Sequence, residues 1–439
     1  MSTHANRALT FLLVLIFLAA SLYGCQTQTP TQVPTTQPPG PTSIPADTQI
    51  PPTPTHTPVK LTVWITTRVG QTAADEAKLA IQEWAKATGN QVEVTENEFF
   101  ELMGKLPIAI PAGTGPDVYM LTNDYVGTFK EGGLLANIDN ALTPEEYAKY
   151  TKSAIDAFSL DGHLWGVPIA ADINALLYNK ALINEIPDTM DELLVQAKAL
   201  THGDQYGLLY PVDNFWYSYP FFSGFGGYVF KPTESGWDIQ DIGFDNPGAI
   251  QGLQYVADMV NLQKLMPPDV SWDVMNSMFT EGKSAMTISN PSMVPSFKEA
   301  GIDVGVVPIP KLSNGEYPRP FATFTGIGVN GYSANIDESQ ALVAYLGSRL
   351  PLVLYYANSG NIPVYADVLK DPELQKDTEL TGWMSQLEHS DPLPSIKEIN
   401  LVWTPALAAF STVVHGKDTA ENALKAAQVQ IQEAIAAEK

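Results

Sequence analysis

Lys60-Leu-Thr-Val-Trp-Ile65 is a short apolar stretch of the kind that forms a buried β-strand. Residues 75–88 follow it with apolar side chains at helical spacing, and Gly89 is placed to end that helix. A second strand pattern covers residues 91–95, a helix-like stretch follows, and residues 116–121 form a third strand pattern. This order of strand, helix, strand, helix and strand predicts an α/β fold with a parallel sheet covered by helices.

Two loops follow the first and third predicted strands, at residues 66–70 and 122–125. Ligands in such folds bind beyond the C-terminal ends of the strands. We therefore expect these two loops to carry residues of a binding site.

The last part of the chain has the pattern of an amphipathic helix. Asp418-Thr-Ala-Glu421 fits a capping box at its start. Apolar residues then recur at helical spacing, at Leu424, Ala427, Ile431 and Ile435. A C-terminal helix is predicted.

Length and charge limit the classes of protein that this chain can represent. Its 439 residues exceed what one hydrophobic core usually organises, so two domains are expected. The formal net charge of -24 argues against a nucleic-acid partner or an anionic membrane surface, since both need clustered Lys and Arg. Acidity that keeps a secreted protein soluble explains the charge better than a cationic ligand does.

The N-terminus has the pattern of a secretory signal. Arg7 is followed by an apolar run over residues 11–20, and Gly24 precedes Cys25, the one cysteine in the sequence. A single cysteine excludes an internal disulfide bond and a metal site built from several cysteines. Residues 1–24 resemble a bacterial lipoprotein signal peptide, in which cleavage precedes the cysteine and its thiol is lipidated. The alternative is an ordinary signal peptide with an incidental cysteine.

A segment rich in proline and threonine follows the predicted lipidation site. Residues 26–58 contain ten Pro and ten Thr among 33 positions. Such a composition cannot bury a core and favours an extended chain. We expect residues 25–58 to form a lipidated, disordered tether.

Motifs of several enzyme classes are absent from the sequence. The six histidines never occur at the three- or four-residue spacing of two metal ligands on one helix, and no Gly-x-Ser-x-Gly motif is present. Gly282-Lys283-Ser284 resembles the end of a phosphate-binding loop, but position 277 is Ser where the first glycine is required. We therefore predict no catalytic residue, metal or cofactor. A pair of carboxylates as in glycosidases remains open, because their separation in the fold decides that chemistry.

Aromatic residues and scattered carboxylates suggest sugar binding. A pyranose packs its apolar C–H face on an aromatic ring, while charged groups and amides bind its hydroxyls. Packing in the core is the alternative for each single ring. The candidate rings are Trp64, Trp216, Tyr217, Tyr219 and Trp403.

From Leu61 to the C-terminus, a series of short motifs occurs in the order found in one known family. The motifs are Leu61-Thr-Val-Trp-Ile65, Gly115-Pro-Asp-Val118, Asn123-Asp124, Gly132-Gly-Leu-Leu-Ala136, Gly166-Val-Pro-Ile-Ala170, Leu176-Leu-Tyr-Asn-Lys180, Gly226-Gly-Tyr-Val-Phe-Lys231, Phe279-Thr-Glu-Gly-Lys-Ser-Ala-Met-Thr-Ile288 and Ala423-Leu-Lys-Ala-Ala427. Together they make the chain resemble the family 1 extracellular solute-binding proteins, and within them the maltose and maltodextrin binding proteins.

The resemblance implies a type II periplasmic-binding-protein fold, with two α/β lobes of parallel or mixed sheets joined by a hinge. Lobe 1 is expected at residues 59–170 and 327–372, and lobe 2 at residues 174–321 and 379–439. The chain is expected to cross between them near Ala171, Thr323 and Glu373.

The resemblance also implies site residues. Asp124 and Asp172 occupy positions of carboxylates that bind sugar hydroxyls, and Trp216 and Trp403 occupy positions of stacking rings. Arg68, Thr67, Tyr125 and Tyr217 complete the candidate ligand-binding residues. The sequence departs from the family at Leu121 and Ser292, which stand in place of stacking Trp residues, and at Tyr125, which replaces a sugar-binding Arg.

The implied function is reversible capture of an oligosaccharide, an α-glucan fragment, and its delivery to the membrane permease of an ABC importer. The protein is expected to be a monomer, anchored by lipid outside the cytoplasm, and not an enzyme. Alternatives are a binding protein for another sugar, a sugar alcohol or glycerol phosphate, a secreted carbohydrate-cleaving enzyme, and an adhesin or sensory protein with the same fold.

Overall fold

The computed structural model describes residues 57–233, 236–356, 361–366, 368, 372 and 376–438. The predicted signal peptide, Cys25 and nearly all of the tether lie outside the described residues, as does the crossing expected near Glu373. Among the helices of the described part, none combines the length and the apolar character needed to span a membrane.

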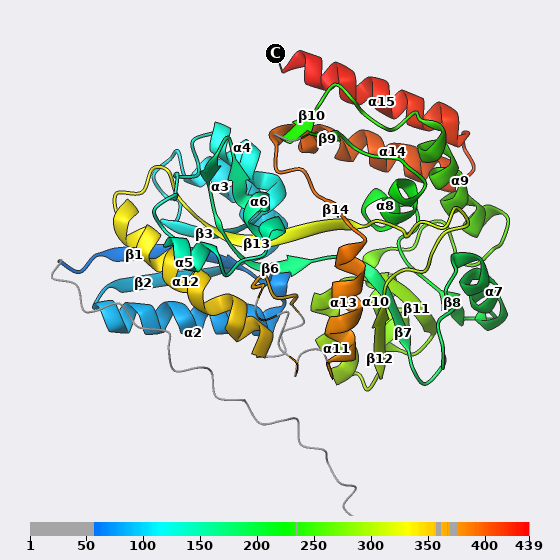
Figure 1. Ribbon diagram of the computed structural model, residues 1–439, viewed down its shortest axis with the longest axis horizontal. Coiled ribbons are helices and arrows are strands. Elements are labelled where there is room, and N and C mark those ends of the chain that lie inside the picture. Colours follow the sequence, from blue (N-terminus) through cyan, green and yellow to red (C-terminus); the bar gives the residue numbers. More distant parts are fainter. Residues whose placement is uncertain are drawn as a thin grey trace, which may run out of the picture. The chain divides into compact units, whose positions relative to one another are not determined.

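The first sheet has six strands, and its first three strands follow the predicted order (Figure 1). Strands β1 (Lys60–Thr66), β2 (Gln91–Asn97) and β3 (Val118–Thr122) are parallel. Strands β6 (Val167–Asp172), β13 (Phe321–Val329) and β14 (Asp391–Pro392) complete it, and β13 runs antiparallel to both β3 and β6. The parallel sheet predicted for the N-terminal part is therefore confirmed, and strands from later in the chain make the whole sheet mixed.

The second sheet has four strands in the order β12, β7, β11 and β8. Strand β7 is antiparallel to both of its neighbours, whereas β11 and β8 are parallel. The strands are β7 (Ala175–Asn179), β8 (Tyr206–Leu208), β11 (Ser284–Ser289) and β12 (Val304–Val307). Two separate hairpins are formed by β4 (Ser159–Leu160) with β5 (His163–Leu164), and by β9 (Lys231–Thr233) with β10 (Gly236–Asp238).

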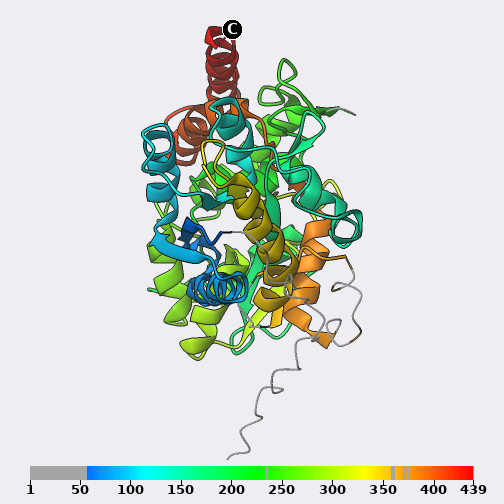
Figure 2. The same cartoon turned by 90° about the vertical axis from the view of Figure 1, so that its left-hand side faces the viewer.

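Helices pack on both sheets and on each other (Figures 1 and 2). Those that contact the first sheet or its loops are α2 (Gln71–Thr88), α3 (Phe99–Ala109), α4 (Val126–Glu131), α6 (Lys152–Phe158) and α12 (Ile336–Tyr356). Those that contact the second sheet are α7 (Met190–Leu200), α10 (Trp272–Thr280), α11 (Val294–Glu299) and α13 (Thr378–Glu388). A further group packs mainly helix on helix: α8 (Phe215–Gly224), α9 (Pro247–Asn261), α14 (Trp403–Val414) and α15 (Ala420–Ala437). The short elements are α5 (Pro144–Tyr147), η1 (Thr67–Val69), η2 (Asn123–Tyr125), η3 (Pro291–Met293) and η6 (Lys397–Leu401).

Local sequence explains where these elements begin and end. In β1 the alternate residues Leu61, Val63 and Ile65 are buried, as a strand with one face on a core requires. Gly89 ends α2 in the left-handed conformation, with φ of 77°, which glycine adopts without strain. Both features confirm the predictions for this part of the chain.

The C-terminal helix is confirmed, but its predicted cap is wrong by one residue. The side chain of Thr419, not that of Asp418, accepts a hydrogen bond from a backbone amide of the first turn, the amide of Asn422. The Asp418 carboxylate instead accepts from the Thr419 amide and from the Asn422 side chain. The apolar positions that were predicted to face the core are buried: Leu424, Ala427, Ile431 and Ile435.

The chain passes from the first sheet to the second between Asp172, at the end of β6, and Ala175, at the start of β7. Strand β13 runs alongside this passage, with Thr323 paired to Asp172, and all nine of its residues are buried. These positions lie next to the crossings expected near Ala171 and Thr323. The proposed lobe boundaries themselves stay a prediction.

Candidate ligand-binding site

Three charged side chains come together where strands of the first sheet end; we call Arg68, Asp124 and Asp172 the polar cluster. Arg68 lies on η1 after β1, and its Nη2 atom is 3.5 Å from Oδ2 of Asp172 at the end of β6. The Arg68 guanidinium also lies over the Phe99 ring, 4.7 Å from its centroid. Asp124 lies on η2 after β3 and accepts a hydrogen bond of 2.5 Å from Thr122 Oγ1.

Burial governs the ionisation of the two carboxyl groups of the polar cluster. Loss of contact with water raises the pKa of both Asp124 and Asp172, and the positive charge of Arg68 opposes this rise in each case. Two polar atoms here are buried and have no hydrogen-bond partner among the described residues, namely Arg68 Nε and Asp172 Oδ1. A donor and an acceptor left open next to each other are suited to a ligand that carries hydroxyl groups.

Two tyrosines contribute neutral hydroxyls near the polar cluster. Burial raises the pKa of Tyr125 to about 12, with the charge of Asp124 as the second cause. Burial also raises the pKa of Tyr217, and here the second cause is the charge of Asp172. Both phenols therefore remain protonated near neutral pH, able to donate and accept hydrogen bonds.

A small cavity of about 10 Å³ lies against the polar cluster. Its volume is near that needed for one water molecule. Residues around both sheets line it: Arg68, Ala170, Ala171, Asp172, Pro291, Ser292, Thr325 and Asn361. Ser292, which stands in place of a family Trp, donates a hydrogen bond of 2.7 Å to Asn290 Oδ1, so the sequence departure leaves a polar cavity wall.

The two predicted tryptophans lie side by side in a second group, the aromatic cluster, formed by Phe215, Trp216, Phe321 and Trp403. Trp216 stacks on Phe321 with ring centroids 5.8 Å apart and planes inclined by 28°. The rings of Trp216 and Trp403 are 6.1 Å apart and inclined by 52°. Phe215 and Phe321 are buried, whereas Trp216 and Trp403 both remain partly exposed. The tryptophans are therefore the members of this cluster that a ligand can reach.

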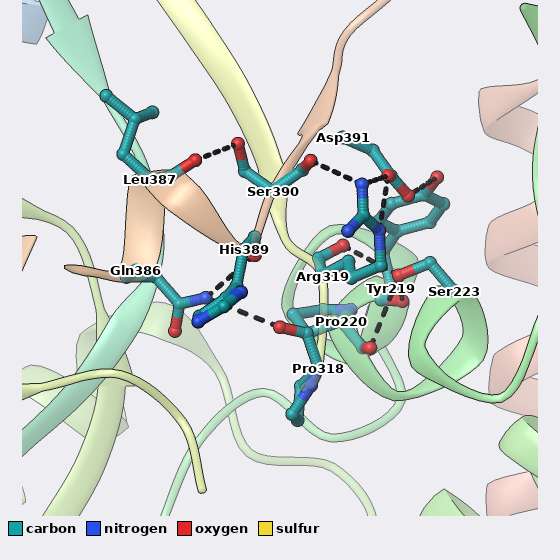
Figure 3. A network of polar contacts seen from close by, with 10 residues as sticks. All are labelled: Tyr219, Pro220, Ser223, Pro318, Arg319, Gln386, Leu387, His389, Ser390 and Asp391. Atoms are coloured by element: carbon teal, nitrogen blue, oxygen red, sulfur yellow. Dashed lines mark hydrogen bonds and ion pairs between the residues drawn. The ribbon is translucent and has the colours of Figure 1, made fainter. Parts of the chain in front are cut away.

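A polar network around Asp391 adjoins the aromatic cluster through Tyr219 (Figure 3 shows the network). Tyr219 stacks on Phe321 with centroids 3.5 Å apart, and its hydroxyl donates to Asp391 Oδ2 at 3.0 Å. Arg319 Nε donates to the other carboxylate oxygen of Asp391 at 2.7 Å, and its Nη2 atom donates to the Ser390 carbonyl. Tyr219 was a candidate sugar-binding ring, but here it is buried against Phe321.

The polar and aromatic clusters are joined through β13. Phe321 begins this strand, and Thr323, two residues later, donates from Oγ1 to the backbone carbonyl of Asp172. The charges of Asp172 and Arg68 act on the pKa of Tyr217, and the preceding residue, Trp216, belongs to the aromatic cluster. The structure thus brings most of the predicted site residues into one continuous region.

Two of the candidate residues have mainly structural contacts, and one residue of the site was not predicted from the sequence. Thr67 opens η1, where its carbonyl accepts from the Gly70 amide, and Trp64 packs on the core of the first sheet. Sequence reasoning did not find Phe321, because it begins a strand whose nine residues are all buried and has no feature that separates it from the core. Leu121, in place of a family Trp, is fully buried in β3.

Known proteins resemble this chain in sequence and in fold. A sequence profile described as bacterial extracellular solute-binding protein matches residues 70–349. The chain belongs to this family. The galactooligosaccharide-binding protein of Bacillus subtilis (strain 168) is 32% identical over 354 residues, which are 79% of this chain and 83% of the relative. A maltooligosaccharide ABC transporter solute-binding lipoprotein of Streptococcus pneumoniae (strain ATCC BAA-255 / R6) is 29% identical over 373 residues, 82% of this chain and 86% of the relative.

A solved structure of a sugar-binding protein has a similar fold. A cyclo/maltodextrin-binding protein complexed with maltotetraose matches with a TM-score of 0.77 and 32% sequence identity, over 87% of this chain and 98% of that one. The predicted type II periplasmic-binding-protein fold and the resemblance to extracellular solute-binding proteins are confirmed.

Proposed function

We propose that this protein binds a neutral oligosaccharide reversibly outside the cytoplasm and delivers it to the permease of an ABC importer. One observation carries the proposal: two partly exposed tryptophans are linked through Tyr217 and β13 to a half-buried polar cluster, in which the buried atoms Arg68 Nε and Asp172 Oδ1 have no partner among the described residues. This combination is what a sugar requires, because its ring has an apolar face and a hydroxylated edge.

The geometry of the two indoles favours a chain of sugars over a single one. Since Trp216 and Trp403 are inclined by 52°, they do not present parallel surfaces to one flat ring. They suit neighbouring units of a bent oligosaccharide, with hydroxyls directed to Asp124, Asp172 and Arg68. An α-glucan fragment is the proposed ligand, and the maltotetraose complex of a structural relative supports it. The galactooligosaccharide-binding relative supplies the rival ligand.

Charge argues against an anionic ligand such as glycerol phosphate. Phosphate groups are usually held by clustered Arg or Lys side chains. The polar cluster combines two Asp side chains with one Arg, and Arg68 is the one basic residue that lines the adjoining cavity within the described structure. A neutral ligand leaves this arrangement without new charge repulsion.

Hinge closure would follow from ligand contacts on both lobes, because such a ligand binds the closed state more tightly than the open one. Anchoring through Cys25 is proposed from the signal-like N-terminus, and the streptococcal relative described as a lipoprotein supports it. The segment between the anchor and the first strand would act as the tether.

A thermal-shift screen followed by calorimetry tests the proposal. The panel contains maltose, maltotriose, maltotetraose, a galactooligosaccharide, a sugar alcohol and glycerol phosphate. A ligand at 100 times its Kd should stabilise the fold by about 2.7 kcal/mol. Stabilisation by glycerol phosphate alone, or by no sugar, would contradict sugar binding.

Chromatography of the same incubations addresses the enzymatic alternative. The oligosaccharides should be recovered at their original length after prolonged incubation. Shortened products that appear with the wild-type protein, and not with Asp172→Asn, would replace the binding function with carbohydrate cleavage.

A further inference from the structure

Asn123 is a buried residue that lies directly before Asp124, and its side chain makes three hydrogen bonds. Its Nδ2 atom donates to the Leu393 carbonyl at 2.9 Å and to Ser395 Oγ at 3.1 Å. Its Oδ1 atom accepts from the Phe324 amide at 2.9 Å. One amide side chain thus joins three segments that are far apart in the sequence: η2, β13 and residues 393–395.

Residues 393–402 lead directly into Trp403, so their path determines the position of the Trp403 backbone, from which the ring extends. Two further bonds hold Ser395: its carbonyl accepts from the Gly127 amide at 2.8 Å, and its hydroxyl donates to the Ala157 carbonyl at 2.7 Å. This segment passes close to α4, since a Cβ atom at Gly127 would lie 2.5 Å from the Lys397 amide nitrogen. Upstream, Asp391 is fixed by Arg319 and Tyr219 (Figure 3).

The hydrogen bond to the Phe324 amide also links Asn123 to the aromatic cluster through strand β13. Phe324 lies three residues after Phe321 on β13, and Phe321 contacts both tryptophans. Asn123 is therefore linked to three residues of the site. It precedes Asp124 in the sequence, and its side chain is hydrogen-bonded to the segment that leads to Trp403 and to strand β13, which begins with Phe321.

We infer that Asn123 is a positioning residue that fixes Trp403 relative to Asp124, and so sets the spacing between the ring and the carboxylate. This inference rests on the proposed sugar-binding function. An amide is suited to the role because it donates two hydrogen bonds and accepts one at the same time. Aspartate at this position would lose both donors and place a second carboxylate beside Asp124.

Fluorine NMR of the ligand-free protein labelled with 5-fluorotryptophan tests the structural half of the inference. The Trp403 resonance is assigned by its loss in Trp403→Phe. Asn123→Ala should shift this resonance, because the Leu393 carbonyl, Ser395 hydroxyl and Phe324 amide lose their shared partner. The matched control is Asn330→Ala, since Asn330 is also a buried Asn whose Nδ2 atom donates to a backbone carbonyl, that of Pro116.

The control should leave the Trp403 resonance in place. An unchanged resonance in Asn123→Ala, or an equal shift in both variants, overturns the inference. Should Asn123→Ala fail to fold, Ser395→Ala replaces it, because this change removes one acceptor of the Asn123 amide while the bond from the Gly127 amide to the Ser395 carbonyl remains. The change also removes the bond from the Ser395 hydroxyl to the Ala157 carbonyl. A folded Ser395→Ala with an unmoved Trp403 resonance likewise overturns the inference.

A double-mutant cycle with maltotriose tests the functional half. Asn123→Ala should weaken binding about tenfold in the wild-type background, which is about 1.4 kcal/mol. In the Trp403→Ala background the same change should cost less than about threefold, because the ring through which Asn123 acts is gone. Equal losses in both backgrounds would refute positioning. Absence of binding by the wild-type protein counts against the proposed function alone, since the NMR experiment decides the position of Trp403 without ligand.

Discussion

Removing the Trp403 ring is the most direct test of the aromatic cluster. The ring begins α14 and is partly exposed, and it contacts Phe215, Trp216 and Phe321 with centroid distances of 6.1 Å in all three pairs. Trp403→Ala should therefore affect both ligand binding and folding, and the two effects have different sizes.

The loss of binding follows from the exposed part of the ring. A tryptophan that anchors a ligand typically contributes about 2 kcal/mol or more, so the Kd should rise at least about thirtyfold. The loss of stability follows from the buried part. A fully buried Trp→Ala change costs about 3–5 kcal/mol, and a partly exposed ring with three aromatic neighbours should cost about 2 kcal/mol.

Titration calorimetry with the best ligand of the panel measures the first quantity, and urea unfolding measures the second. Trp272→Ala is the matched control, because Trp272 also begins a helix and is 44% exposed, but lies on α10. The control should keep wild-type affinity. A Trp403→Ala protein that binds as tightly as the wild type would show that the ring only packs between helices, and would remove it from the site.

Four further predictions concern charge, anchoring and motion. Asp172→Asn should weaken oligosaccharide binding by about 1–2 kcal/mol in calorimetry, because a charge-assisted hydrogen bond becomes a neutral one, and an unchanged Kd would contradict this role. Burial raises the pKa of Asp124 above the usual 3.8, so its contribution to stability is present at low pH and is lost as pH rises through the raised value. Between pH 4 and 7 the Tm of the wild type should therefore fall more than the Tm of Asp124→Asn. Parallel curves of Tm against pH for the two proteins would exclude this contribution. Cys25→Ser should release the protein into the soluble fraction, and failure of labelled fatty acid to enter the wild type would refute lipidation. Saturating ligand should reduce the radius of gyration in small-angle scattering, and an unchanged radius would argue against hinge closure.

Much of the first sheet could be predicted because its signals are local. The alternation of Leu61, Val63 and Ile65, and the glycine after α2, each depend on a few neighbouring residues. The error at Thr419 has a local cause as well, since two adjacent residues can both cap a helix and only the structure shows which one does.

The site could be predicted only in part, because its arrangement depends on contacts between distant segments. Asp124 and Trp403 were found through resemblance to a family, which carries information about position that composition lacks. Phe321 and Asn123 gave no such signal, since one is a Phe in an apolar strand and the other was noted only as part of a motif. Their roles arise from contacts with residues such as Trp216 and Leu393, far away in the sequence.

Strand β13 also has a consequence for how the chain folds. Its Phe324 amide bonds to Asn123, 201 residues earlier, and the strand pairs with β3, β6 and β14. Contacts between such distant segments make folding slow, because a long loop must close before the pairing is gained. Until β13 arrives, β3 and β6 have unpaired edges that are open to association with other chains. The first sheet is thus begun by the N-terminal strands but completed only when most of the chain is available.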